Sequence, residues 1–292
     1  MARYRRQFGD RKEGRLLRSL PAFNRFIPFI MPVRNDACNQ YEESFEVTNV
    51  DRRLRRLRVD GYKGIGMLHF LIAAYIRGVS MLPGINRFVV GRRIYARNNI
   101  EVVMTVKRTI ALGAPETTIK VQFEPTDTIF DVYRKMNERI EEIKSNEGNN
   151  NTEDVAEALS RLPRFLLRFA IFLLRIMDYF GWLPEALTDA SPFHGSMIIT
   201  DLGSLRIGPI YHHIYNFGTL PVFIAFGAKY HKYELNRKGE LCDNKYIDLK
   251  CVMDERMCDG HYYSQFLQGM RYIFLHPEII ETPPTRVVED ID

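Results

Sequence analysis

The sequence predicts an α+β fold, in which strands occur in runs and helices cover one face of the sheet. The stretch from Tyr41 to Val50 alternates polar and apolar residues, which is typical of a half-buried strand. Met67–Met81 is apolar at helical spacing and predicts a core helix. Three later runs, Met197–Thr200, Leu220–Phe226 and Tyr246–Val252, are short and apolar, as buried strands are. Because the strands cluster in runs, the pattern favours the α+β class.

Further elements follow from the same patterns. We expect a short basic helix from Lys12 to about Leu20 and an arginine-rich helix that Asp51 caps. Phe88–Tyr95 and Ile100–Lys107 look like paired strands, and Thr117–Phe123 like another. The remaining expectations are a helix over Thr126–Lys144 that Thr126 starts and Asp131 supports, a loop over Ser145–Asn151, and a closing helix over Tyr262–Leu275.

Length and composition bound the domain organisation. The 292 residues, 46% of them hydrophobic, suit one large domain or two small ones. We interpret residues 1–40 as a basic N-terminal arm and residues 41–292 as one domain with an amphipathic helical insert at about 160–190. The first residues are charged but lack an apolar core, so they do not read as a secretory signal. The four cysteines show no disulfide framework, and reduced thiols predict a cytoplasmic protein.

The net charge of +5 is modest, and much of it comes from arginines near the N-terminus and between residues 52 and 58. Such an excess suits an anionic small molecule, an acidic partner or a lipid surface, but it is more commonly plain solubility charge. Aromatic residues are not interleaved with the basic ones as in a nucleic-acid module, so we expect no nucleic-acid partner.

The insert contains the most hydrophobic stretch of the chain, from Leu162 to Leu183. Its longest wholly apolar run, Phe169–Leu174, is far shorter than the roughly 20 residues that cross a bilayer. Arginines project from nearly one side of the expected helix: Arg161, Arg164, Arg168 and Arg175. The helix either packs on the body of the domain with one wet stripe, lies in a membrane interface, or is buried between subunits. The first is the simplest interpretation, and the narrow stripe favours a subunit or domain contact over a membrane.

Two motifs carry the chemistry. Residues Asp254 to Gly260 read DERMCDG, and residues Met197 to Gly203 read MIITDLG. They resemble the Asp-His-Arg-x-x-Asp-Gly signature and the Phe-Thr-Ile-Ser-Asn-Leu-Gly strand of the acyltransferase core of 2-oxo-acid dehydrogenase complexes. The first is also similar to the His-His-x-x-x-Asp-Gly signature of chloramphenicol acetyltransferase. The resemblance covers most of residues 41–280, and the two motifs together are quite specific.

The resemblance implies a mixed β-sheet covered by helices and a homotrimer or a multiple of trimers. The family moves an acyl group between coenzyme A and a thiol such as dihydrolipoyl, so acyl-CoA is the implied substrate and a lipoyl-bearing protein the implied partner. The family's active site lies between subunits, so Glu255 of one subunit would face the Thr200 hydroxyl of its neighbour. Both would be catalytic residues.

The resemblance also implies a role for the rest of the signature. Asp259 would belong to the catalytic set and hold the loop through an arginine, for which Arg25 and Arg34 are both candidates. Three residues would shape the site: Asp254, Arg256 and Gly260.

Glu255 stands where the family has its catalytic histidine. Histidine suits a base because its ordinary pKa, about 6.5, lies near working pH, whereas a carboxylate with a pKa of about 4.3 is a weak base unless it is buried. Glu255 is therefore a base in an altered environment, part of a changed chemistry, or the mark of a site that no longer catalyses.

Other histidines and the cysteines offer second-tier candidates. His212 and His213 follow the Thr200 strand, and His261 lies just past the signature. A His-His pair is more often structural than catalytic. The cysteine spacings fit no zinc finger, ribbon or knuckle, so we expect no metal.

The leading hypothesis is a free-standing, trimeric acyltransferase that uses acyl-CoA. No segment resembles a lipoyl domain or an alanine-proline linker, so no covalent lipoyl is expected on this chain. The competing hypothesis is a catalytically inactive scaffold or interaction protein on the same fold, with peripheral membrane contact as one use of the insert. A weaker third is transfer to a small alcohol or amine.

Overall fold

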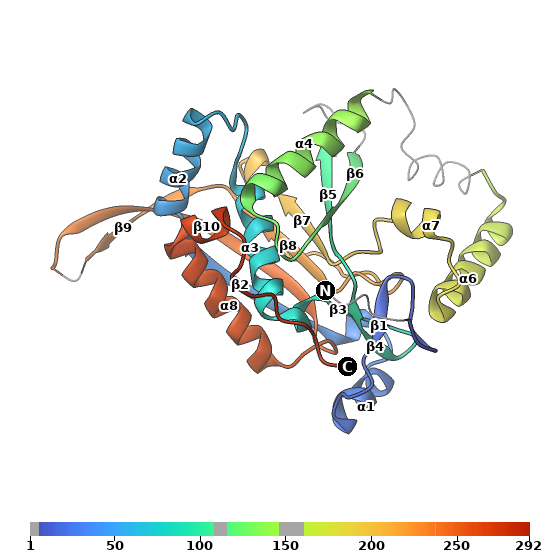
Figure 1. Ribbon diagram of the computed structural model, residues 1–292. Coiled ribbons are helices and arrows are strands. Elements are labelled where there is room, and N and C mark those ends of the chain that lie inside the picture. Colours follow the sequence, from blue (N-terminus) through green and yellow to red (C-terminus); the bar gives the residue numbers. More distant parts are fainter. Residues whose placement is uncertain (1–5, 108–115, 146–160, 237) are drawn as a thin grey trace.

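A mixed seven-stranded sheet forms the centre of the molecule (Figure 1). The structure, a computed structural model, describes residues 6–107, 116–145, 161–236 and 238–292. The strand order is β2-β10-β8-β7-β5-β6, and β9 pairs with the N-terminal part of β10. β5 and β8 flank β7 in parallel and the other pairs are antiparallel. The strands are β2 (Cys38–Glu46), β5 (Ile100–Lys107), β6 (Glu116–Phe123), β7 (Met197–Asp201), β8 (Val222–Phe226), β9 (Tyr230–Leu235) and β10 (Leu241–Asp254).

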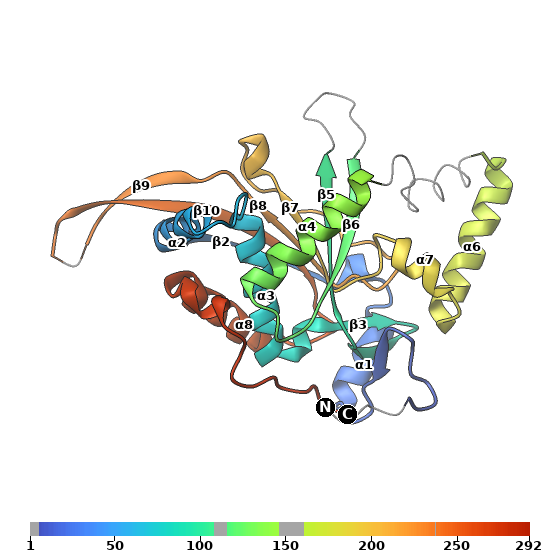
Figure 2. The same cartoon turned by 45° about the horizontal axis from the view of Figure 1, so that its top comes forward.

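Four helices cover one face of this sheet (Figures 1 and 2). They are α2 (Thr48–Val59), α3 (Met67–Met81), α4 (Ile129–Ser145) and α8 (Gly260–Leu275). Alternate strand residues face these helices, so Ile199 and Ile224 belong to the main core together with the fully buried Phe70 and Tyr75. The expected helix over Met67–Met81 and the expected helix over Tyr262–Leu275 are confirmed.

The opposite face of the sheet carries a much smaller apolar cluster. Phe223 of β8 and Val252 of β10 pack there against Ile214, which lies in the segment that follows β7. Among the described residues an irregular segment and no helix packs on this cluster. This is the uncovered face of the sheet, meaning the face without helices, and Thr200 lies on it.

A second, three-stranded sheet holds the N-terminal part of the chain against the body. β1 (Gly14–Leu16) pairs with β4 (Arg93–Arg97), which forms a hairpin with β3 (Arg87–Val90). The expected pairing of Phe88–Tyr95 with Ile100–Lys107 is wrong, because Gly91 and Arg92 turn the chain back within the first of these ranges. Both have positive φ, 58° and 59°, as the two central residues of a type I′ turn require.

Three local expectations are also wrong. Residues 12–20 contain β1 and no helix, whereas α1 (Ala22–Ile30) forms in the apolar stretch that follows Pro21. Asp51 does not cap α2 but lies in its first turn, with its carboxylate bonded to Lys229 and Lys245. Helix α4 starts at Ile129 rather than at Thr126, and the loop expected after Ser145 lies outside the described residues.

The insert forms two helices beside the body, α6 (Arg164–Phe180) and α7 (Glu185–Ala190) (Figure 1). Asp178 is the only buried residue of α6, and large apolar side chains along this helix are exposed. The simplest expectation, a helix that buries its apolar side chains against the domain and exposes only one stripe of arginines to solvent, is therefore wrong for this chain.

Candidate functional site

The signature residues lie directly after β10, where Asp254 is the anchor. Its side chain is fully buried and accepts a hydrogen bond from Arg34 Nε at 3.2 Å. Arg256 donates from Nε at 2.8 Å and from Nη2 at 2.7 Å. One buried carboxylate thus binds two buried guanidinium groups, and the bidentate pair with Arg256 fixes the first turn after the strand.

The Arg34 guanidinium is fully enclosed. Besides Asp254, it donates to the carbonyl oxygens of Tyr215, at 2.6 Å, and of Val89 and Gly218, each at 2.9 Å. Burial lowers the pKa of Arg34, and the charge of Asp254 opposes this effect. Arg34 thereby ties the N-terminal segment to the signature and to the segment before β8. It is bonded to Asp254 rather than to Asp259.

Glu255 is held in place by its backbone and not by its side chain. Its N–H donates to the Ala37 carbonyl at 2.8 Å, and the side chain is exposed. Among the described residues its carboxylate has no hydrogen bond or ion pair. The single chain therefore presents Glu255 to its surroundings from a rigid turn.

Asp259 and Gly260 start helix α8. The Asp259 carboxylate accepts the N–H of Tyr262 at 2.9 Å, so Asp259 is an N-cap residue. Arg25, the second arginine considered for Asp259, lies exposed on α1. A Cβ added at Gly260 would meet no atom of the chain within 4 Å. The fold of the single chain thus gives no reason for a glycine at this position.

Thr200 lies on the face of the sheet that the helices leave uncovered. Ile199 belongs to the main core under the helices and Ile198 packs on the cluster of the opposite face, so Thr200, two residues after Ile198, points to that opposite face as well. Its register partner on β8 is Ala225, which pairs in turn with Lys250 of β10. Glu255 follows Lys250 by five residues along the same chain. At about 3.4 Å per residue and 4.8 Å per strand, Thr200 and Glu255 of one chain are about 20 Å apart.

The turn after Thr200 is built by its own motif. The Asp201 carboxylate accepts the N–H of Ser204 at 2.9 Å, and burial raises the pKa of Asp201. A Cβ at Gly203 would lie 2.7 Å from the Gly227 carbonyl oxygen, so only glycine fits there. The motif therefore has a structural reason that is independent of catalysis.

Among the described residues no hydrogen bond or ion pair joins a second-tier histidine to Glu255, but His212 lies on the same face of the sheet as Thr200, because it packs on Phe223. His212 stacks on Phe223 with ring centroids 4.2 Å apart, and its buried Nε2 has no hydrogen-bond partner among the described residues. Burial lowers the pKa of His212, as does the charge of His213. His213 is exposed, and His261 is exposed in the first turn of α8.

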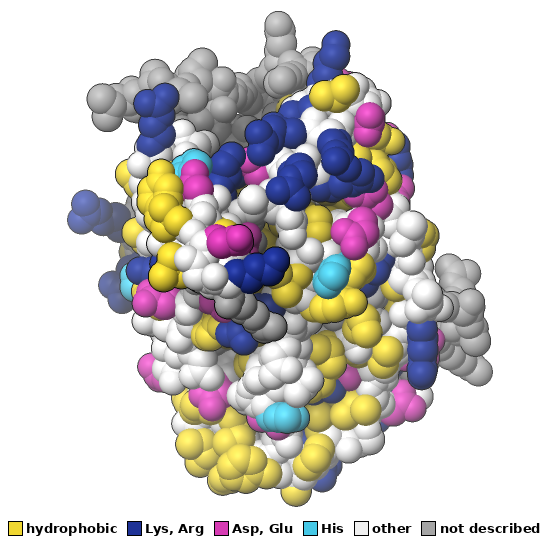
Figure 3. All heavy atoms as spheres, turned by 90° about the vertical axis from the view of Figure 1, so that its left-hand side faces the viewer, with side chains coloured by type: hydrophobic (Ala, Val, Ile, Leu, Met, Phe, Trp, Pro, Cys, Tyr) yellow, Lys and Arg dark blue, Asp and Glu magenta, His cyan; other side chains and the backbone are white. Residues whose placement is uncertain are grey.

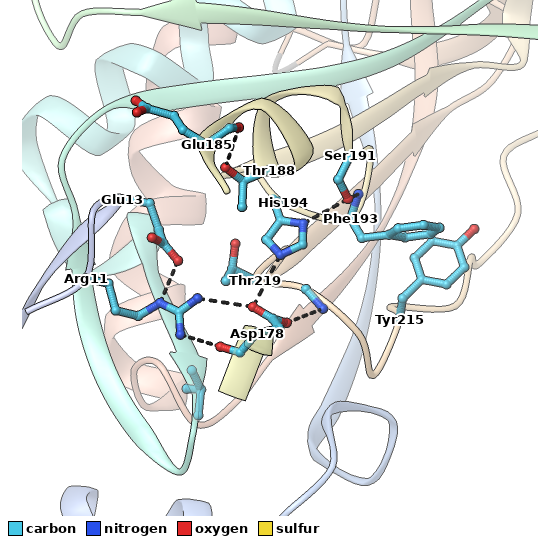
Figure 4. A network of polar contacts seen from close by, with 12 residues as sticks. Arg11, Glu13, Asp178, Glu185, Thr188, Ser191, Phe193, His194, Tyr215 and Thr219 are labelled. Atoms are coloured by element: carbon cyan, nitrogen blue, oxygen red, sulfur yellow. Dashed lines mark hydrogen bonds and ion pairs between the residues drawn. The ribbon is translucent and has the colours of Figure 1, made fainter. Parts of the chain in front are cut away.

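A buried polar network that the sequence did not suggest surrounds Asp178 of α6 (Figure 4). His194 Nε2 lies 3.3 Å from Asp178 Oδ1, and its Nδ1 lies 2.8 Å from the Ser191 hydroxyl. Arg11 donates to the Asp178 carboxylate at 3.1 Å and to its carbonyl at 2.6 Å, and Gly218 donates its N–H. The partners come from three separate segments, so no local motif could have revealed the network.

Basic side chains gather on the face that carries α2 (Figure 3). A cavity of about 200 Å³ there is lined in part by Arg52, Arg53 and Arg56. Arg53 is paired with Glu281.

The four cysteines are free thiols, and burial raises the pKa of both Cys251 and Cys258 to about 12. Such thiols do not readily become the thiolates that zinc binds.

The fold is shared with solved acyltransferase structures, although no family model and no curated protein matches the sequence. The dihydrolipoamide acetyltransferase of Azotobacter vinelandii has a TM-score of 0.58 at 12% identity, over 94% of this chain and 95% of that one. The cubic core of the pyruvate dehydrogenase multienzyme complex has a TM-score of 0.52 at 13% identity, over 94% and 95%. Chloramphenicol acetyltransferase has a TM-score of 0.50 at 12% identity, over 86% and 94%. The chain therefore has the chloramphenicol acetyltransferase-like fold that its two motifs predicted.

Proposed function

We propose that the protein is an acyltransferase that moves an acyl group between acyl-CoA and a thiol such as dihydrolipoyl, at a site that two subunits complete. The observation that carries this proposal is the separation of Thr200 and Glu255. They are about 20 Å apart in one chain, yet each is placed on accessible structure by its own rigid motif. A second copy that packs on the uncovered face of the sheet brings a Glu255 to a Thr200.

Two further observations support a site between subunits. A Cβ built on Gly260 would meet no described atom within 4 Å apart from its chain neighbours and the backbone of its own helix, which leaves room for a substrate or another subunit near Glu255. A cavity of about 500 Å³ opens on the uncovered face and is lined by Glu42, Ser44 and Lys250, among others. Lys250 pairs with Ala225, and Ala225 pairs with Thr200, so this cavity lies in the same part of the sheet as Thr200.

The proposed reaction uses few groups. The Glu255 carboxylate accepts the proton of the acceptor thiol, whose sulfur attacks the thioester carbonyl. The Thr200 hydroxyl donates a hydrogen bond to the oxygen that becomes negatively charged in the tetrahedral intermediate. The intermediate then expels the thiolate of coenzyme A, which takes the proton back from Glu255. Asp254, Arg34 and Arg256 hold the turn that presents Glu255.

The test is thiol release from a panel of acyl-CoAs with dihydrolipoamide as acceptor. Wild type should turn over at least one acyl-CoA, and Glu255→Gln and Thr200→Ala should each reduce kcat by about 10²–10³-fold. Glu138→Gln is a matched control, because its side chain is exposed on α4, which covers the face of the sheet opposite Thr200. Wild-type activity that survives both substitutions would overturn the proposal.

The Glu255 carboxylate is exposed and has no partner among the described residues, which favours a second candidate: a catalytically inactive protein that keeps the pocket of the fold. An inactive wild type that binds coenzyme A saturably and gains transfer activity in Glu255→His would establish this alternative. An active wild type rejects it.

A further inference from the structure

Helix α6 presents an apolar arc to solvent. Seven large side chains fall within about 140° of the helix circumference, since successive residues turn by about 100°. All seven are more than 40% exposed: Phe165, Leu166, Phe169, Phe172, Leu173, Tyr179 and Phe180. Trp182 follows directly after the helix and is 65% exposed. Monomeric surfaces seldom leave so many neighbouring aromatic side chains in water.

The charges on α6 are one-sided. Arg164, Arg168 and Arg175 lie within about 40° of one another on one flank of the apolar arc. The one acidic residue of the helix, Asp178, is buried in its network and faces the body. The surface of α6 therefore carries only positive charge beside its apolar side chains.

Helix α1 repeats this chemistry next to α6. Its exposed residues include Phe23, Phe26, Phe29 and Ile30, and its only charged residue is Arg25. The turn between β3 and β4 lies between the two helices, because Arg92 stacks over the Phe29 ring at 5.6 Å and Gly91 touches the Tyr179 backbone. A cavity of about 420 Å³ at this junction is lined by residues that include Val33, Arg92, Arg175, Tyr179 and Arg256.

The position of α6 is fixed and not incidental. The Asp178 network bonds the C-terminal end of the helix to the N-terminal segment through Arg11, to the segment before β7 through His194, and to Gly218 (Figure 4). A buried carboxylate with this many partners holds the helix in one orientation. The fold therefore holds the apolar arc toward solvent.

We propose that α6 and α1 form a surface that binds an anionic phospholipid membrane. The apolar side chains enter the boundary between headgroups and acyl chains, and the arginines bind the lipid phosphates. Charge favours this occupant over a two-fold pairing of this surface with itself, since such a pairing would place arginines opposite arginines and supply no anion. A contact with a different surface of a second copy is an outcome of the test. Neither helix can span a bilayer, and no helix of the described residues is long and apolar enough to do so. The proposal places both helices in the interface plane of the membrane.

This arrangement has a consequence for the signature. Arg256 lines the same cavity as Arg175 and Tyr179 of α6, and it also holds Asp254, the residue before Glu255. Membrane binding would therefore bring the lipid surface close to the Glu255 turn, whether or not that turn is catalytic.

The experiment is co-sedimentation of the full chain with vesicles of phosphatidylcholine alone and of phosphatidylcholine with phosphatidylglycerol. We expect binding to the anionic vesicles to be at least about tenfold stronger and to weaken with salt. A triple variant, Phe165→Ser, Phe169→Ser and Phe172→Ser, should reduce it about tenfold or more, and so should Arg168→Gln with Arg175→Gln. Free inorganic phosphate at millimolar concentration should not compete.

The control is Leu235→Ser with Leu241→Ser, which removes two equally exposed apolar side chains from the β9–β10 hairpin and should leave vesicle binding unchanged. Circular dichroism checks that every variant is folded. Wild type that stays in the supernatant with anionic vesicles overturns the proposal. So does a triple variant that binds vesicles like wild type, or one whose only change is a smaller oligomer, since that result makes the arc a contact between copies.

Discussion

At the scale of single residues, Asp254 is the clearest structural requirement of the fold. Its carboxylate is fully buried and pairs with both Arg34 and Arg256. The signature predicted a structural role for Asp254 and Arg256, and the structure brings the two together. It could not predict that Arg34 joins them, because 220 residues separate Arg34 from Asp254 and no local pattern links them.

We predict that Asp254→Asn lowers the free energy of unfolding by about 3–5 kcal/mol, because the substitution leaves two buried guanidinium groups without their counter-charge. Urea unfolding measures this loss. Asp243→Asn is the control, since Asp243 is paired with His231 on the surface and its removal should cost about 0.5 kcal/mol or less. Equal effects of the two substitutions would contradict the account of the Asp254 cluster.

Asp51 should make stability depend on pH. Burial acts to raise its pKa, but hydrogen bonds and charges from Lys229 and Lys245 prevail and lower the pKa to about 2. Because the pKa of Asp51 is lower in the folded state than in the unfolded state, its charge stabilises the folded protein. This stabilisation is complete above the unfolded pKa of about 3.9 and is lost as pH falls toward 2. Asp51→Asn should therefore cost about 1–2 kcal/mol at neutral pH and progressively less below about pH 4.

Urea unfolding of wild type and Asp51→Asn across this pH range checks the prediction. A difference between the two proteins that stays constant down to about pH 2.5 would show that Asp51 does not act through its charge.

At the scale of elements, the sequence was most informative where hydrophobic periodicity is uninterrupted. Met67–Met81 and the strands at β6, β7 and β8 match their expected ranges closely. Expectations failed where a turn or a residue distant in the sequence determines the local structure. Gly91 and Arg92 split an apparent strand into a hairpin. Asp51, which was expected to cap a helix, instead forms an ion cluster with Lys229 and Lys245. The exposure of α6 is a third case, because an apolar sequence alone does not show what covers it.

Helix α6 should depend on the Asp178 network for its attachment. In Asp178→Asn the amide keeps the shape of the side chain but loses the ion pair with Arg11 and weakens the contact with His194. We predict faster amide hydrogen exchange in α6 and unchanged exchange in α3, which lies in the main core. Hydrogen exchange measured by mass spectrometry resolves the two helices. Equal acceleration in both would mean that the network stabilises the whole fold and not the attachment of α6.

At the scale of the whole molecule, the two motifs were sufficient to predict the fold. Overall sequence identity to the solved structures is only 12–13%, which is too low to predict a fold without such motifs. Each motif has a structural role in the single chain. Gly203 packs against the Gly227 backbone, and Asp254 binds two arginines. The candidate site could be predicted only in part. The sequence supplies its residues, but their separation in one chain follows from strand register, and in the proposed function a second copy is needed to bring them together.

The most direct test of this account is activity in mixed assemblies of two inactive variants. Glu255→Gln and Thr200→Ala subunits, each inactive alone in the acyl-CoA assay, are co-expressed in equal amounts and purified together. If each site takes Glu255 from one subunit and Thr200 from its neighbour, random mixing restores about a quarter of the wild-type activity, because one interface in four pairs two intact residues. A mixture that stays as inactive as its parents would place both residues in the same chain's site and contradict the proposed interface.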